Sequence, residues 1–197
     1  MTASTIATAQ LVLVLCGVPG SGKSTIANAI LAAHAVRPAS CRAWRRISQD
    51  VLGSRGRCIA AAERALRAGD HLIVDRCNFD AQQRAHWLTL RAEPPPSYRM
   101  ALFLPVEQEE ARRRVLTRGA HEGGVDAESM DERKISQIVG RMYSSLHPPT
   151  SGEGFDEVLR IDDRESAKAA LRRIWEVAGQ GQGMPLSDTG GYGGDGV

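Results

Sequence analysis

The stretch that decides the fold is the apolar run LVLVLC (11–16), which continues directly into the segment GVPGSGKST (17–25). An uninterrupted apolar run predicts a central parallel strand that is covered on both faces. Residues 25–34 repeat apolar side chains at helical spacing. Between a strand and a helix, the pattern G-x-x-x-x-G-K-[ST] predicts a loop that binds nucleotide phosphates. A chance glycine-rich turn is the alternative, and this context argues against it.

The predicted phosphate loop offers two kinds of phosphate contact. Its glycines permit backbone turns in which successive N–H groups face an anion, and the first turn of the following helix adds its own unpaired N–H groups. Lys23 would reach the outer phosphates and serve in catalysis, and the Ser24 hydroxyl would bind Mg²⁺. The nucleotide-binding set is predicted to be Gly17, Pro19, Gly20, Ser21, Gly22, Lys23, Ser24 and Thr25.

Composition narrows the class of protein only modestly. A length of 197 residues fits one α/β domain, and 25 basic against 23 acidic residues give a net charge of +2, which is too mild to indicate nucleic-acid binding. The four cysteines form no C-x-x-C pair, so we predict neither a zinc site nor a disulfide framework, and an intracellular setting, nucleus or cytoplasm, fits. The longest apolar run near the start has six residues, too few to span a membrane.

The rest of the chain alternates predicted strands and helices. Strands are expected at 11–16, 43–48, 72–75, 98–104 and 157–161, and helices at 25–34, 58–68, 81–91, 106–117, 129–146 and 165–178. Such alternation predicts an α/β fold in which helices cover both faces of a five-stranded parallel sheet. We expect the domain to cover 10–178, after a disordered lead-in at 1–9 and before a disordered glycine-rich tail at 179–197.

Two carboxylates follow strands that neighbour the loop in this scheme. Ligands of parallel sheets bind beyond the carboxyl ends of the strands, where Asp50 and Asp75 are expected. Asp75 would hold Mg²⁺ beside Ser24, and its alternative role is a cap of the next helix. Asp50 could accept the proton of an attacking hydroxyl as a general base, and its alternative is again an N-cap. Spacing alone leaves both alternatives open.

A basic helix offers groups that could neutralise a transferring phosphate. Arg114 and Arg118 are four residues apart, so we expect them on one helical face, next to a glycine-bearing segment predicted to form a lid at about 118–131. The alternative is a solvated basic face that pairs with the glutamates one turn earlier. In a chain with 22 arginines and three lysines, an arginine carries little information by its presence.

Through these residues the chain resembles the kinase domain of polynucleotide 5′-hydroxyl kinases over about 11–161. The segment ISQDVLGS (47–54) is similar to the one that carries the family's catalytic aspartate, and DRCNFD (75–80) resembles its D-x-T-N element. TRG (117–119) resembles its arginine-bearing lid. The kinase-like domain fused to aprataxin-type histidine-triad modules in plant-lineage proteins is also similar, through DRCN (75–78) and HEG (121–123).

The resemblance implies the fold of a P-loop NTPase, a three-layer sandwich with a helical lid. It also implies an enzyme that uses ATP and Mg²⁺ to phosphorylate the 5′-hydroxyl end of DNA or RNA in nucleic-acid repair. It implies Asp50 as the general base. The residues expected to contact the nucleic acid are Arg55, Arg57, Arg76 and Asn78.

The substrate side departs from the family pattern, so two other functions stay open. Gly53 stands where phage-type enzymes have an arginine that grips the substrate, Arg55 replaces an aromatic residue of animal-type enzymes, and Cys77 replaces a threonine. One alternative is a small-molecule kinase that acts on a sugar or nucleoside. The other is a non-catalytic module that binds nucleic-acid ends in the presence of ATP. The sequence does not indicate an oligomeric state.

Overall fold

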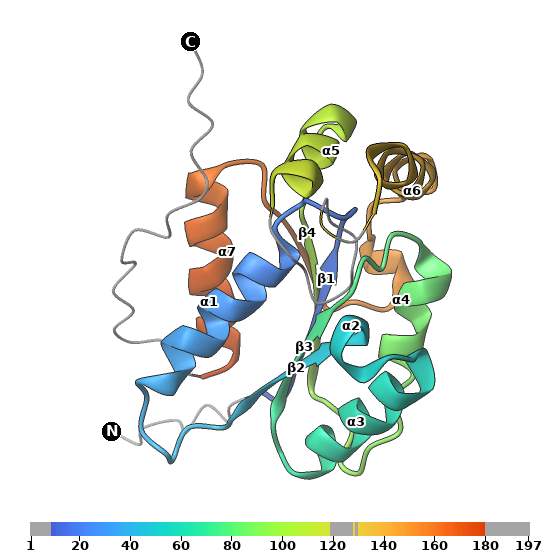
Figure 1. Cartoon of the computed structure of the whole chain (residues 1–197). Coiled ribbons are helices and arrows are strands. Elements are labelled where there is room, and N and C mark those ends of the chain that lie inside the picture. The colour runs from blue at the N-terminus through green and yellow to red at the C-terminus, as the bar shows by residue number, and fades with distance from the viewer. Residues whose placement is uncertain (1–8, 119–127, 129, 180–197) are drawn as a thin grey trace.

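A parallel five-stranded sheet with strand order β2-β3-β1-β4-β5 forms the centre of the protein (Figure 1). The computed structural model describes residues 9–118, 128 and 130–179. The strands are β1 (Leu11–Cys16), β2 (Trp44–Ser48), β3 (His71–Asp75), β4 (Tyr98–Phe103) and β5 (Glu157–Arg160). The predicted α/β fold is therefore confirmed. The expected lead-in and tail, apart from residues 9 and 179, lie outside the described residues, as does most of the expected lid at 118–131.

The central strand β1 has the double covering that its apolar run predicts. All six of its residues are 0% exposed. It pairs with β3 through Val12 and Leu72 and with β4 through Leu11 and Tyr98, in parallel register. A strand buried on both faces has no polar side, which explains why the run shows no alternation.

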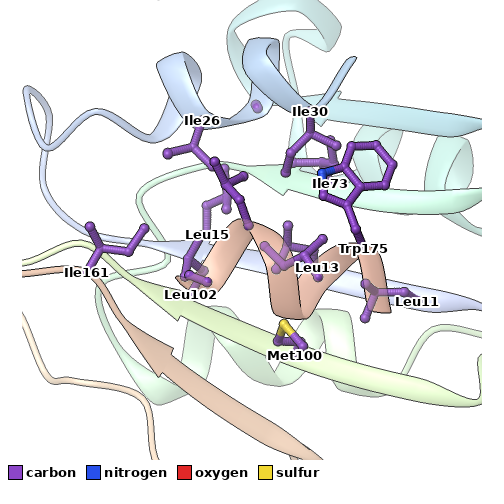
Figure 2. Close-up of a cluster of buried hydrophobic side chains, with 14 of the residues drawn as sticks. Leu11, Leu13, Leu15, Ile26, Ile30, Ile73, Met100, Leu102, Ile161 and Trp175 are labelled. Atoms are coloured by element: carbon purple, nitrogen blue, oxygen red, sulfur yellow. The ribbon is translucent and has the colours of Figure 1, made fainter. Parts of the chain in front are cut away.

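Helices cover both faces of the sheet (Figure 1). They are α1 (Lys23–Ala35), α2 (Gln49–Leu52), α3 (Arg55–Arg67), α4 (Ala81–Leu88), α5 (Gln108–Thr117), α6 (Glu132–Ser144) and α7 (Arg164–Val177), with a short 3-10 helix η1 (Ser151–Glu153). Leu11, Leu13 and Leu15 face α1 and α7, where Trp175 joins their cluster (Figure 2). Val12, Val14 and Cys16 point to the opposite face, which α3 and α4 cover.

Several helix boundaries differ from the expected ones for local reasons. Helix α3 begins at Arg55 rather than near residue 58, because the Ser54 hydroxyl caps it and accepts a hydrogen bond from the Arg57 N–H at 3.3 Å. Helix α5 ends at Thr117, and Arg118 has extended backbone angles of φ −77° and ψ 145°. The Arg118 N–H still donates to the Arg114 carbonyl oxygen at 3.2 Å, so Arg118 completes the last turn of α5, and the shared face of Arg114 and Arg118 stays a prediction.

Helices α5 and α6 form a small apolar cluster of their own above the sheet (Figure 1). Ala111 and Val115 of α5 pack with Ile135 and Val139 of α6, and Val18 of the phosphate loop belongs to the same cluster. The phosphate loop is thus packed against this helix pair as well as against the sheet. Within the part of the chain that the structure describes, no helix is long and apolar enough to cross a membrane.

Candidate active site

The phosphate loop follows β1 with the backbone geometry that its glycines permit. Gly20 and Gly22 have φ angles of 83° and 95°, a region that side chains disfavour. A Cβ on Gly20 would also lie 2.5 Å from the Ala111 carbonyl oxygen of α5. The Gly17 N–H donates to the Cys77 carbonyl oxygen at 2.9 Å. The loop is therefore held by contacts from the segment after β3 on one side and from α5 on the other.

Lys23 starts α1 with its ammonium group inside the loop. The residue is 7% exposed, and Nζ donates to the Val18 carbonyl oxygen at 2.7 Å and to Ser21 Oγ at 3.3 Å. The next residue, Ser24, lies half-buried in the first turn of α1. Both side chains are thus at the positive end of the helix dipole, where phosphate groups are favoured.

Asp75 ends β3, the strand that neighbours β1, and is 5% exposed. Both Nε and Nη2 of Arg46, on the adjacent strand β2, lie 2.8 Å from its Oδ2. Asp75 is also the register partner of Ser48. The structure therefore brings Asp75 to the edge of the sheet that carries the phosphate loop, as the sequence predicts, and adds an arginine to it. Its role toward Mg²⁺ stays a prediction.

Asp50 lies just beyond the carboxyl end of β2, in the first turn of α2. Because α2 begins at Gln49, Ser48 occupies the N-cap position, and the alternative of Asp50 as the N-cap is wrong. Asp50 is exposed, so a substrate hydroxyl could reach its carboxylate. Its role as a general base remains a prediction that this position supports.

Three predicted substrate arginines come from α3 and from the segment after β3. Nη1 of Arg55 lies 2.7 Å from Nε2 of His86, and the Arg76 guanidinium lies 5.7 Å from the centroid of the Trp87 ring. Burial lowers the pKa of Arg76, the charge of Arg55 lowers it further, and Asp50 opposes the shift. Arg76 is therefore within electrostatic reach of Arg55 and of Asp50. Arg57, in the first turn of α3, is exposed.

Asn78 has a different place from the one predicted. It is 0% exposed, and its Nδ2 donates to the Leu15 carbonyl oxygen at 2.8 Å. Its Oδ1 accepts a hydrogen bond from Trp87 Nε1 at 2.8 Å, and its backbone has a φ of 44°. A side chain so enclosed cannot contact a substrate. We therefore correct the assignment: Asn78 fixes the segment after β3 against β1.

Arg84 forms a buried network that the sequence reasoning did not find. Its side chain is 0% exposed, and Nε and Nη2 donate to the Glu153 carboxylate at 2.7 and 2.8 Å. Nη1 donates to the carbonyl oxygens of Asn78 (3.0 Å) and His147 (2.9 Å). The network joins the segment after β3 to the segment between α6 and β5. The sequence gives no local signal for it, because Glu153 lies 69 residues away.

The basic face of α5 is partly explained by ion pairs, as the alternative interpretation expected. Arg112 pairs with Glu109 and, across to α6, with Glu132 at 2.6 Å, and Arg113 pairs with Glu110. Arg114 also pairs with Glu110, yet its Nη1 lies 3.5 Å from the Gly20 carbonyl oxygen. Arg114 is therefore the arginine of α5 that reaches the phosphate loop. Arg118, half-buried at the end of α5, keeps its predicted role as a prediction only.

The side chains at the loop offer a set of oxygen atoms that suits Mg²⁺. Ser24 and Asp75 supply a hydroxyl and a carboxylate, and the buried Ser48 hydroxyl has no hydrogen-bond partner among the described residues. Mg²⁺ prefers such hard ligands and is usually held by few protein groups together with phosphates and water. Within the described ranges, no cluster of three or more His, Cys, Asp or Glu side chains could bind a metal ion. A Mg²⁺ ion at Ser24 and Asp75 would take its further ligands from nucleotide phosphates and water.

Arg46 and Ser48 are site residues that the sequence reasoning passed over. The alternation of a strand could have predicted them, because every second residue of a strand lies on the same face. Given that Trp44 packs under α1, Arg46 and Ser48 share its face of β2. This alternation points to the site only when β2 is known to lie beside β3, the strand that ends at Asp75.

A phosphate loop after β1, acidic residues at the ends of β2 and β3, and the strand order 2-3-1-4-5 define a P-loop kinase-like domain. The chain belongs to the AAA domain family AAA_33, whose family model matches residues 12–143.

Two characterised proteins are similar in sequence. "Transcription factor bHLH140" of Arabidopsis thaliana is 30% identical over 155 residues, which is 76% of this chain and 16% of that protein. The "bifunctional polynucleotide phosphatase/kinase" of Schizosaccharomyces pombe is 27% identical over 153 residues, 77% of this chain and 33% of that protein. The chain thus spans a third or less of the length of either relative.

Solved structures share the fold at low sequence identity. A fungal RNA kinase superposes with a TM-score of 0.67 at 16% identity, covering 86% of this chain and 87% of its own. Kti12 of Chaetomium thermophilum in complex with ADP-AlF3 has a TM-score of 0.57 at 22% identity, with 85% and 98% covered. A gluconokinase from Sinorhizobium meliloti gives 0.55 at 19%, with 85% and 94% covered. At these identities the three structures show that the chain shares their fold.

Proposed function

We propose that this chain is an ATP- and Mg²⁺-dependent kinase that phosphorylates the 5′-hydroxyl end of DNA or RNA. The observation that carries the proposal is the position of the exposed Asp50 just after β2, the strand beside β3 and Asp75, at the end of the sheet that holds the phosphate loop. Arg55 and Arg57, both exposed, follow in the first turn of α3. Positive charge near the base suits an acceptor hydroxyl on an anionic molecule. The similarity to a polynucleotide phosphatase/kinase supports the same acceptor class.

The reaction assigns a distinct task to each side chain. Asp50 accepts the proton of the 5′-hydroxyl, whose oxygen then attacks the γ-phosphorus in line, and the bond between that phosphorus and the β–γ bridging oxygen breaks to release ADP. Lys23 and Arg114 stabilise the negative charge that develops on the phosphate oxygens. Ser24 and Asp75 would hold Mg²⁺, which would supply further neutralisation of that charge.

The arginines around Asp50 bind the acceptor. The positive charge of Arg55 lowers the pKa of Arg76, and an anionic phosphodiester that binds to both would offset this repulsion. Arg57 adds a third, exposed positive charge on α3. Such backbone contacts do not read sequence and weaken with salt. We therefore expect end-specific, sequence-tolerant phosphorylation that is strongest at low ionic strength.

The test is transfer of labelled γ-phosphate to an oligonucleotide with a 5′-hydroxyl, with the 5′-phosphorylated oligonucleotide as the control acceptor. Asp50→Asn should lower kcat by about 10²–10⁴-fold, because the general base is lost, without weakening nucleotide binding. Asp162→Asn, at an exposed ion pair with Arg160, is the matched control and should keep full activity.

Other outcomes would contradict the proposal in different ways. Transfer to gluconate or a nucleoside, with none to oligonucleotides, would favour the small-molecule kinase. ATP-dependent binding of DNA or RNA without turnover would favour the non-catalytic module. An Asp50→Asn protein with full activity would remove the general-base assignment alone.

A further inference from the structure

The buried hydroxyl of Ser48 makes no hydrogen bond to the part of the protein that the structure describes. Ser48 is the last residue of β2 and is 2% exposed. Its N-cap position before α2 is one where a serine hydroxyl usually accepts a helix N–H, yet no such side-chain bond is formed. Because buried hydroxyls are normally paired, this one is set up for a partner from outside the chain.

The position of Ser48 narrows the identity of that partner. Trp44, Arg46 and Ser48 alternate along β2 on the face that packs under α1. Ile73 and Asp75 of β3 lie on the same face, and Ser48 is the register partner of Asp75. Neighbouring strands are about 4.8 Å apart. The Ser48 hydroxyl is therefore next to the Asp75 carboxylate, on the side where the phosphate loop enters α1.

We propose that Ser48 is a further active-site residue, whose hydroxyl binds a water molecule of the divalent cation that Ser24 and Asp75 would hold. The inference rests on the Mg²⁺ and ATP site of the proposed function but not on its acceptor. A hydroxyl can both accept from and donate to such a water, and Mg²⁺ retains several waters in protein sites. One strand beyond Asp75, Ser48 is placed to contact the hydration shell of the cation.

The experiment measures binding of a non-hydrolysable ATP analogue by calorimetry while Mg²⁺ is raised, with no acceptor present. Ser48→Ala should raise the Mg²⁺ concentration that gives half-maximal strengthening of nucleotide binding by about tenfold, because partners in the outer shell of a metal typically affect its affinity on that scale. Affinity in EDTA should not change. Ser48→Thr keeps the hydroxyl and should restore the wild-type Mg²⁺ dependence.

Ser97→Ala provides the matched control, because the Ser97 hydroxyl accepts a hydrogen bond from the Gln10 N–H at the amino ends of β1 and β4, away from the phosphate loop. It should leave the Mg²⁺ dependence unchanged. The inference is overturned if Ser48→Ala keeps the wild-type dependence, or if it weakens binding equally with and without Mg²⁺, which would indicate a direct phosphate contact. A wild-type protein whose nucleotide binding ignores Mg²⁺ would also overturn it. Failure to phosphorylate oligonucleotides would instead count against the proposed acceptor.

Discussion

Glu153→Gln offers the sharpest test of the buried ion pair between Arg84 and Glu153. The change removes the negative charge opposite Arg84. Because the Arg84 side chain is 0% exposed, water cannot solvate its positive charge in place of the carboxylate. It also places an amide NH₂ against a guanidinium N–H, because Arg84 donates to both carboxylate oxygens of Glu153. Removing one partner of a buried ion pair usually costs 3–5 kcal/mol. The glutamine can still accept one of the two bonds, so we expect about 3 kcal/mol.

The free energy of unfolding should be measured by urea titration, with tryptophan fluorescence and circular dichroism as two probes of the same transition. Glu165→Gln is the control, because its pair with Lys168 on α7 is largely exposed, and it should cost less than about 1 kcal/mol. A Glu153→Gln protein that loses no more stability than this control would refute the argument that the buried charge needs its partner.

The pH dependence gives an independent check on the same pair. Burial acts to raise the pKa of Glu153, but hydrogen bonds from Arg84 and Thr150 outweigh it, so the pKa lies below its usual value of 4.5. The unfolded chain therefore binds the proton first as pH falls, and the stability that Glu153 contributes is present above about pH 4.5. The gap in stability between wild type and Glu153→Gln should narrow as pH falls below that value.

Three further predictions concern other parts of the fold. Gly20→Ala should abolish nucleotide binding and lower the melting temperature, because its Cβ would lie 2.5 Å from the Ala111 carbonyl oxygen; Gly56→Ala, with open space around it within α3, should instead stabilise by about 1 kcal/mol. Burial lowers the pKa of His71 from 6.5 to about 3, so the unfolded chain binds a proton between these values that the folded chain does not. Unfolding free energy should therefore fall by about 2 kcal/mol from pH 7 to pH 5, and a titration that is flat there would contradict it; His71→Asn, which retains an acceptor for the Leu11 N–H, should flatten the profile. Asp163→Ala should cost about 1 kcal/mol in urea titrations, because its carboxylate caps α7 by accepting the Ser166 N–H at 2.7 Å.

The sequence alone determined the elements that depend on local pattern. The apolar run of β1, the glycine spacing of the phosphate loop and the helix after it follow from backbone preferences and burial within about 25 residues, and the structure has all three where they were expected. Helix ends were less predictable, because single caps such as Ser54 decide them.

Only the tertiary structure decided which distant groups meet. The order β2-β3-β1 places Asp75 on the strand next to the one that carries the phosphate loop and Asp50 one strand further, and no local pattern states which strands are neighbours. The need for glycine at position 20 comes partly from Ala111 of α5. Asn78 matched a substrate-contacting pattern and is buried instead, because Leu15 and Trp87 occupy its hydrogen-bonding groups. Contacts between residues far apart in the chain depend on packing geometry, which composition and spacing do not encode.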